Sequence, residues 1–307
     1  MIRGTNKMSF TGRREILFLY TVKDANPNGD PLNQNHPRYD EDTEQVLVSD
    51  VRIKRTIRDQ WVREGKYVFV DGESKTLKTR FEELRKLTGK STGKEVLGEC
   101  LDTRLFGVTF ALDKEAFSWT GPVQFKWGRS LHAATFEFIQ GTAAFATKED
   151  SQQRSFRNEY KVPFALIAVY GIANQYAARF TGASDQDLED LAAALWTGTD
   201  NLITRSKTEH KARLYLEIEY RDGFNGKIGS LDEKLVLLSR TGEKLDRDAQ
   251  KALRGLDEVM VDVLPLVEAL KKHQKVIKQV KVIHDPELLL KGEDDLKGLG
   301  FLALETR

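Results

Sequence analysis

The sequence is poor in the residues that build disulfide frameworks and metal clusters. Its 307 residues include a single cysteine, Cys100, so no disulfide can form within one chain and a reducing compartment is permitted. The five histidines show no metal-ligand spacing such as His-Glu-x-x-His. We therefore expect no metal site, and we interpret Cys100 as a small, partly buried residue rather than a nucleophile.

Features that would direct the chain to a membrane are also missing. The sequence contains no run of 18 apolar residues, and residues 1–10 do not form a signal-peptide pattern. We expect a soluble, cytoplasmic protein without a membrane partner.

The usual signatures of enzymes are absent as well. The sequence has no Ser/His/Asp set, no phosphate-binding P-loop, no zinc cluster and no glycine fingerprint for a dinucleotide. We expect a protein that is not an enzyme, with no catalytic residues and no cofactor.

The charge is unevenly distributed along the chain. The formal net charge is only +1, which is low for a nucleic-acid-binding protein. However, residues 1–180 hold 28 Lys and Arg against 23 Asp and Glu, whereas residues 181–307 hold 20 against 24. A near-neutral total can therefore hide a basic groove and an acidic back. The length and the 40% hydrophobic content suit one large elaborated domain over residues 1–307 or two small ones, and we favour the single domain.

The most informative stretch joins a turn-rich loop to a capped helix. Residues 15–22 have the apolar character of a buried strand, and the loop DANPNGDP at 24–31 ends it. Ser49 is a good N-cap, Asp50 suits the first turn, and Ile53, Ile57 and Trp61 then recur on one helical face. The pattern predicts a helix whose open N-terminus can receive a phosphate.

This predicted helix is rich in cations. Between residues 51 and 58 there are four cations and no acid, and an unbalanced face of this kind favours an anionic partner. The alternative is a surface helix whose cations are merely solvated. We predict RNA contacts from Ser49, Arg52, Lys54, Arg55 and Arg58.

The loop also carries two candidate metal ligands, Asp24 and Asp30. Carboxylate oxygens suit hard divalent cations. Turn chemistry explains the Asp and Asn residues of this loop equally well, and we favour that explanation.

A second group of candidates follows Gly121. The segment 121–130 alternates polar and bulky residues and reaches Gly128, which allows close approach of a ligand. We predict phosphate contacts from Lys126 and Arg129. Trp127 is suited to base stacking, but we favour a core position for it.

Residues 136–170 read as two long strands joined by a polar tip. The tip at 147–161 carries Lys148, Arg154, Arg157 and Lys161, and its polarity predicts a protruding hairpin. We predict RNA contacts from Lys148, Arg154 and Arg157; an ordinary mobile loop is the alternative. Further along, residues 212–220 alternate with a period of two and predict a strand, and His210 is expected at the surface. Lys207 and Lys211 could line the groove, but their motif is too common for us to select them as RNA contacts.

Together these motifs resemble the backbone subunit of type I CRISPR Cascade complexes, a RAMP superfamily member, and are most similar to subtypes I-B and I-C. The resemblance is carried by residues 22–31, 47–55, 101–107 (LDTRLFG), 121–125, 128–130 and 162–166. It implies an α+β fold with an RNA-recognition-like (ferredoxin-like) core, a finger-like insertion at 65–101 and a thumb hairpin at 140–162.

The resemblance also implies a function. Copies of such a subunit polymerise along the CRISPR guide RNA and present its bases for pairing with target DNA, beside other Cascade subunits and without catalysis. Two alternatives stay open. Type III relatives cut target RNA with a loop aspartate, so Asp24 or Asp30 can serve a metal-dependent ribonuclease; the chain can also be an unrelated protein-interaction module.

Overall fold

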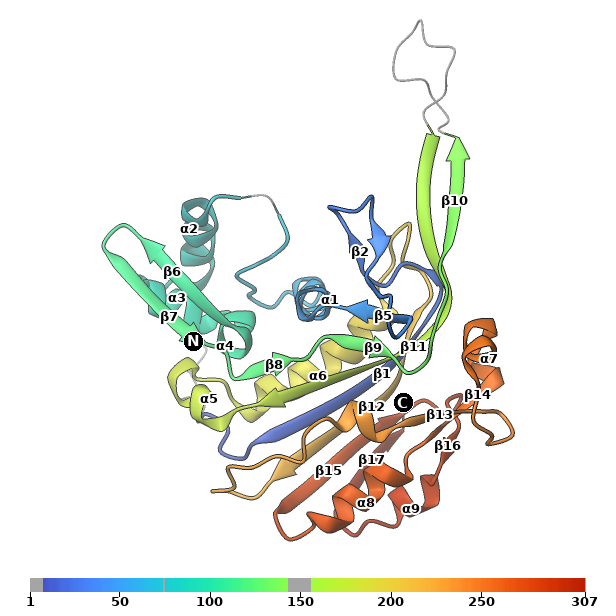
Figure 1. The fold of residues 1–307 in the computed structure, drawn as a ribbon. Coiled ribbons are helices and arrows are strands. Elements are labelled where there is room, and N and C mark those ends of the chain that lie inside the picture. Colours follow the sequence, from blue (N-terminus) through green and yellow to red (C-terminus); the bar gives the residue numbers. More distant parts are fainter. Residues whose placement is uncertain (1–7, 74, 143–155, 307) are drawn as a thin grey trace, which may run out of the picture.

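A long central sheet organises the chain. The computed structural model describes residues 8–73, 75–142 and 156–306. Within them a ten-stranded sheet runs in the order β17-β15-β12-β1-β11-β9-β5-β4, with β8 and β10 also paired to β11 (Figure 1). Its strands are β1 Arg14–Ala25, β4 Tyr39–Asp40, β5 Gln45–Val48, β8 Val123–Phe125, β9 Gly128–Ser130, β10 Glu137–Thr142, β11 Phe156–Ala173, β12 His210–Tyr220, β15 Ile277–His284 and β17 Leu302–Thr306.

The antiparallel trio β11-β1-β12 forms the middle of this sheet. Residues 14–22 of β1 are buried without interruption, since both faces of the sheet are covered. This confirms the strand that the sequence predicts at 15–22 and the strand predicted at 212–220.

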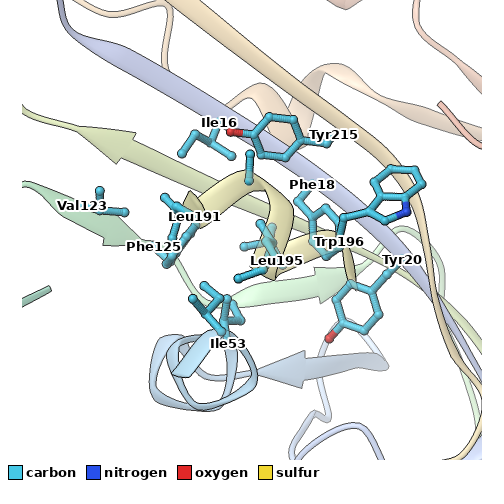
Figure 2. Packing of buried hydrophobic residues seen from close by; sticks show 14 of the residues in the cluster. Ile16, Phe18, Tyr20, Ile53, Val123, Phe125, Leu191, Leu195, Trp196 and Tyr215 are labelled. Carbon is cyan, nitrogen blue, oxygen red and sulfur yellow. The ribbon is translucent and has the colours of Figure 1, made fainter. Parts of the chain in front are cut away.

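Two long helices cover one face of the sheet, α1 Asp50–Arg63 and α6 Asp185–Asp200. Ile53, Ile57 and Trp61 of α1 are buried in one cluster with Leu191 and Leu195 of α6. Figure 2 shows this cluster between the helices and the sheet. The predicted apolar stripe of α1 is therefore confirmed, and it places the N-terminus of α1 beside the end of β1.

A second layer covers the opposite face. It contains the small sheet β13 Val236–Ser239, β14 Val259–Asp262 and β16 Leu290–Lys291, and the helices α8 Leu264–Lys272 and α9 Glu293–Lys297. These elements share a separate hydrophobic cluster with Leu17 and Leu19 of β1. Because successive side chains of a strand point to opposite faces, Phe18 faces α1, whereas Leu17 and Leu19 face this second layer.

A smaller unit stands beside α1. Its elements are α2 Leu77–Thr88, α3 Gly93–Glu99, α4 Leu101–Phe106, β6 Gly107–Leu112 and β7 Glu115–Thr120. Phe81, Leu97 and Phe110 form its own hydrophobic core. The backbones of Gly107 and Gly121 meet so closely that a Cβ on Gly121 would lie 2.0 Å from the carbonyl carbon of Phe106. Only glycine permits this join between the unit and the sheet.

The hairpin predicted from residues 136–170 is present in the described residues. Strands β10 and β11 pair from Glu137 and Lys161 to Thr142 and Phe156, and the ladder projects from the sheet (Figure 1). The predicted tip residues Lys148 and Arg154 lie outside the described residues.

The remaining elements are short and connect these layers. They are β2 Gly29–Asp30, β3 His36–Pro37, α5 Gln175–Thr181, α7 Arg247–Ala252 and two 3₁₀ turns, η1 Leu231–Lys234 and η2 Leu256–Glu258.

The expected mixture of helices and strands is confirmed, with two local corrections. The apolar and aromatic residues at 67–70 (YVFV) predict a short strand, but the structure has no strand there. The glycines and polar residues at 91–98 (STGKEVLG) predict a flexible, turn-rich segment, but α3 begins at Gly93 because Thr92 and Glu95 form a capping box.

Replacing Ile57 by alanine should destabilise the protein. Ile57 is fully buried between α1 and the sheet, so Ile57→Ala should lower the free energy of unfolding by about 2–5 kcal/mol. The matched control is Val51→Ala, because Val51 is 66% exposed on the same helix and its replacement should change stability by no more than about 0.5 kcal/mol. Urea denaturation measures both, and equal losses would contradict the packing described above.

Candidate nucleic-acid interface

The entrance of α1 is built as the sequence predicts. Ser49 is the N-cap, and its hydroxyl accepts a hydrogen bond from the backbone N–H of Arg52 at 3.3 Å. The backbone N–H of Ser49 donates to Asn28 Oδ1 at 2.8 Å. This bond ties the turn-rich loop to the helix, so Asn28 has the structural role that turn chemistry indicates.

Three of the predicted cations on α1 have carboxylate partners. Lys54 lies 3.4 Å from Asp50, Arg55 lies 2.6 Å from Asp59, and Arg58 lies 2.9 Å from Asp102. The interpretation of these side chains as uncompensated is therefore wrong. Asp50 and Asp59 lie one helical turn from their partners, just outside residues 51–58, and Asp102 comes from α4.

The pair between Arg58 and Asp102 is structural. Asp102 is fully buried and also accepts hydrogen bonds from the backbone N–H groups of Phe69 at 2.7 Å and Val70 at 3.1 Å. The Arg58 guanidinium neutralises this carboxylate and lies over the ring of Phe106 at 5.1 Å. One flank of α1 is thus committed to holding the small unit in place.

Arg52 lies on the other flank of α1 and is different. Its guanidinium donates to Thr56 Oγ1 at 2.8 Å, and no carboxylate of the described residues forms an ion pair with it. Burial lowers the pKa of Arg52, and its Nε has no hydrogen-bond partner among the described residues.

Arg52 and His210 of β12 line the same small cavity, and the charge of Lys207 acts on His210. Burial, followed by the charge of Arg52, lowers the pKa of Lys207 to about 8. Burial, followed by the charges of Lys207 and Arg52, lowers the pKa of His210 to about 3. We call Arg52, Lys207 and His210 the unpaired cluster, since none of the three makes an ion pair in the described part of the chain.

Sequence reasoning missed two members of the unpaired cluster. His210 is 4% exposed, so its expected surface position is wrong. Its ring stacks on Tyr20 with 6.1 Å between the ring centroids. No local sequence signal marks this arrangement, because β12 and α1 meet only through the fold.

The second predicted group lies on the opposite face of the sheet. Lys126 Nζ is 3.0 Å from Asp232 and 2.7 Å from Glu233, and Arg129 is 2.7 Å from Asp40. The hydrogen bond from Arg129 lowers the pKa of Asp40. The structure therefore does not bring Lys126 and Arg129 together with the cations of α1.

The favoured core position of Trp127 is also wrong. Trp127 is 43% exposed, and the guanidinium of Arg38 lies 5.8 Å from the centroid of its ring. Phe125, two residues earlier, is the buried aromatic side chain of this segment; it ends β8, whereas Trp127 lies in the connection between β8 and β9.

The predicted hairpin cations are only partly described. The backbone of Arg157 pairs with Gly141 in the β10–β11 ladder. Lys161 lies 2.7 Å from Asp24 and 3.4 Å from Glu137.

The two loop aspartates are engaged with cations. Asp24 binds Lys161, and Asp30 lies 3.3 Å from Arg38. Within residues 8–73, 75–142 and 156–306, no group of three or more His, Cys, Asp or Glu side chains is arranged to hold a metal ion. In the same ranges no helix has the length and apolar character needed to cross a membrane.

The architecture is that of a protein with a large central sheet, a projecting hairpin and a helix with cationic flanks. Comparison with known proteins identifies the class. Residues 12–263 match the family described as CRISPR-associated protein Cas7. The chain belongs to this family, as the motifs in its first 180 residues predict.

Individual relatives agree with this assignment. The chain is 32% identical to the CRISPR-associated protein Cas7 of Haloferax volcanii, over 92% of this chain and 90% of the relative. It shares its fold with a chain of a "CRISPR RNA-guided surveillance complex, pre-nicking" at a TM-score of 0.56 and 14% identity, over 95% of this chain and 96% of the other. A chain of another "CRISPR RNA-guided surveillance complex" gives a TM-score of 0.53 and 17% identity, over 95% and 94%.

Replacing Asp102 should test the structural role of its pair with Arg58. Asp102→Asn leaves the Arg58 guanidinium without its buried counter-charge, so the free energy of unfolding should fall by about 3–5 kcal/mol. Asp59→Asn is the control, because its pair with Arg55 is partly exposed and should contribute less than about 1 kcal/mol. Chemical denaturation distinguishes the two variants, and similar small losses from both would show that the pair with Asp102 is dispensable.

Proposed function

We propose that this chain is a non-catalytic backbone subunit of a type I Cascade complex, of subtype I-B or I-C. It binds the CRISPR guide RNA, polymerises along it into a helical filament, and leaves guide bases free to pair with target DNA in antiviral defence. The observation that carries the proposal is membership of the Cas7 family over residues 12–263. Relatives of the same fold are chains of RNA-guided surveillance complexes, which suggests that this chain has guide RNA and other Cascade subunits as partners.

The shape of the subunit suits this role. An RNA-recognition-like core, a finger made by the small unit around residues 65–101, and a thumb made by the β10–β11 hairpin at 140–162 would together surround a strand. A filament subunit must meet its own copies, and the projecting hairpin provides a means to reach the next one (Figure 1).

The predicted RNA-binding side chains fall into two groups, one at α1 and one on the opposite face and in the hairpin. Ser49 and Arg52 lie at the entrance of α1, and Lys54, Arg55 and Arg58 lie along it with remaining donors beyond their ion pairs. A guanidinium has five N–H donors, so the Asp102 partner of Arg58 leaves others for phosphate, whereas Arg55 also donates to the carbonyls of Val70 and Asp71. The cations on the opposite face and in the hairpin would serve RNA held by a neighbouring copy; these are Lys126, Arg129, Lys148, Arg154 and Arg157.

Sequence choice would rest with the guide and not with the protein. Contacts to ribose and phosphate position a strand without reading it, while base pairing supplies the specificity. We therefore expect similar affinity for guides of unrelated sequence, and we place the subunit in the cytoplasm, where guide and target meet.

Purified protein should bind guide-length single-stranded RNA with an affinity that falls as salt rises, because phosphate contacts release counterions. Fluorescence anisotropy at several salt concentrations measures the affinity, and negative-stain electron microscopy of the bound sample should show helical filaments. A salt-independent affinity or an absence of assemblies would contradict the proposal.

The same sample tests the ribonuclease alternative. With Mg²⁺ and an RNA complementary to the guide, a non-catalytic subunit leaves the target intact. Regularly spaced cuts that disappear in Asp24→Asn or Asp30→Asn would establish catalysis by a loop aspartate instead.

A further inference from the structure

A groove lies where β8 and the end of β11 meet the chain that leads from β12 into η1. It is lined by side chains of the two strands, by residues 227–230 and by Lys234. Its volume is about 660 Å³. Pockets that hold small molecules measure about 300–1,000 Å³, a class that suits a ligand of nucleotide size. We call this site the lysine groove.

The charges that line the lysine groove are of one sign. Lys126, Lys227 and Lys234 line it, whereas no Asp or Glu of the described residues does. Lys126 uses two of its three N–H donors on Asp232 at 3.0 Å and Glu233 at 2.7 Å. Lys227 and Lys234 make no ion pair in the described part of the chain, and the one carboxylate on which the charge of Lys234 acts, Glu233, is already bonded to Lys126. The groove therefore offers two ammonium groups to an anionic ligand.

A buried carboxylate holds one wall of the groove in place. Glu15 is fully buried and accepts hydrogen bonds from the backbone N–H groups of Ile228 and Gly229, each at 2.7 Å. The hydroxyl of Tyr170, which also lines the groove, donates to the same carboxylate at 2.6 Å. No cation among the described residues pairs with Glu15. Its charge is thus stabilised by this wall itself, so the wall has one fixed shape.

The same wall contains a strained backbone position. Ser230 has a φ of 46° and a ψ of 50°, the left-handed conformation that residues other than glycine rarely adopt. Gly229, with a φ of 76°, precedes it. Strain of this kind costs free energy and gathers at ligand-binding sites, where it helps to pre-organise the site. The lysine groove is therefore shaped before a ligand arrives.

We propose that the lysine groove binds single-stranded DNA, namely the strand of the target duplex that the guide displaces. The proposal rests on the function proposed above, because only pairing of the guide with one DNA strand sets the other strand free. Lys227 and Lys234 contact its phosphates as point charges, without reading sequence. Phe125 and Ile172 add apolar surface for the sugars and bases.

The position of the groove favours the displaced strand over the guide. The groove meets α1 through Gln124, whose side-chain oxygen accepts a hydrogen bond from Lys54 at 3.0 Å. It thus lies beside the predicted guide-binding residues of α1 and not among them. A strand that has just left the duplex has to run next to the guide, and its phosphates carry the negative charge that this groove lacks.

Removing both free lysines should weaken DNA binding by guide-loaded protein. The sample is the chain assembled with saturating guide RNA, and the probe is a labelled single-stranded DNA without complementarity to the guide. Lys227→Met combined with Lys234→Met should reduce affinity for this DNA about tenfold. It should also lower the slope of log affinity against log salt by about 1.4, since each phosphate contact to a single strand contributes about 0.7. Fluorescence anisotropy at several salt concentrations measures both quantities.

Lys244→Met is the matched control. Lys244 is exposed and makes no ion pair in the described part of the chain, but it follows β13 and does not line the groove. Its replacement should leave the DNA affinity and the salt slope unchanged. Guide RNA affinity should be the same in the wild type, the double variant and the control.

Titrations with guide RNA and with DNA separate the outcomes. If the wild-type chain does not bind guide RNA, the proposed function fails and the lysine groove loses its ligand with it. If the chain binds the guide and the double variant equals the wild type in DNA affinity and slope, only the groove is refuted. Loss of guide affinity in the double variant would show that the groove holds the guide instead. Equal losses of DNA affinity in the double variant and in Lys244→Met would show a general effect of charge and also overturn the proposal.

Discussion

At Arg52 a positive charge is buried without a carboxylate partner among the described residues. A desolvated cation is costly unless it is paired, and proteins normally supply a carboxylate. Arg58 follows this rule through Asp102, whereas Arg52 on the same helix does not. Under the function proposed above, the guide RNA would bring the negative charge that Arg52 lacks.

The two flanks of α1 therefore have different roles: the flank with Arg58 stabilises the fold, and we assign RNA binding to the flank with Arg52. On one flank, Arg58 and Asp102 fasten α4 and the segment at residues 67–70 to the helix. On the other, Arg52 and His210 of β12 line the same small cavity. The apolar stripe led by Ile57 fixes the helix between these flanks, so both depend on the same packing against the sheet.

Local chemistry could be predicted from the sequence, and long-range charge pairing could not. The cap at Ser49 and the stripe of α1 follow from spacing alone, so they were predictable. The partner of Arg58 lies 44 residues away, and His210 meets α1 only after the strands of the sheet have paired. The apparent excess of cations in residues 51–58 was therefore a misleading signal for three side chains, because it considered only their neighbours in sequence. The helix α3 was missed although its signal is local: the Thr92–Glu95 capping box lies among glycines, which are typical of turns.

Cryo-electron microscopy of the chain assembled with guide RNA tests the central claim most directly. The account predicts a backbone phosphate at the entrance of α1, with one oxygen within hydrogen-bond reach of the Arg52 guanidinium and the His210 ring. A map in which the RNA follows another surface, and in which only solvent meets Arg52 and Lys207, would contradict it.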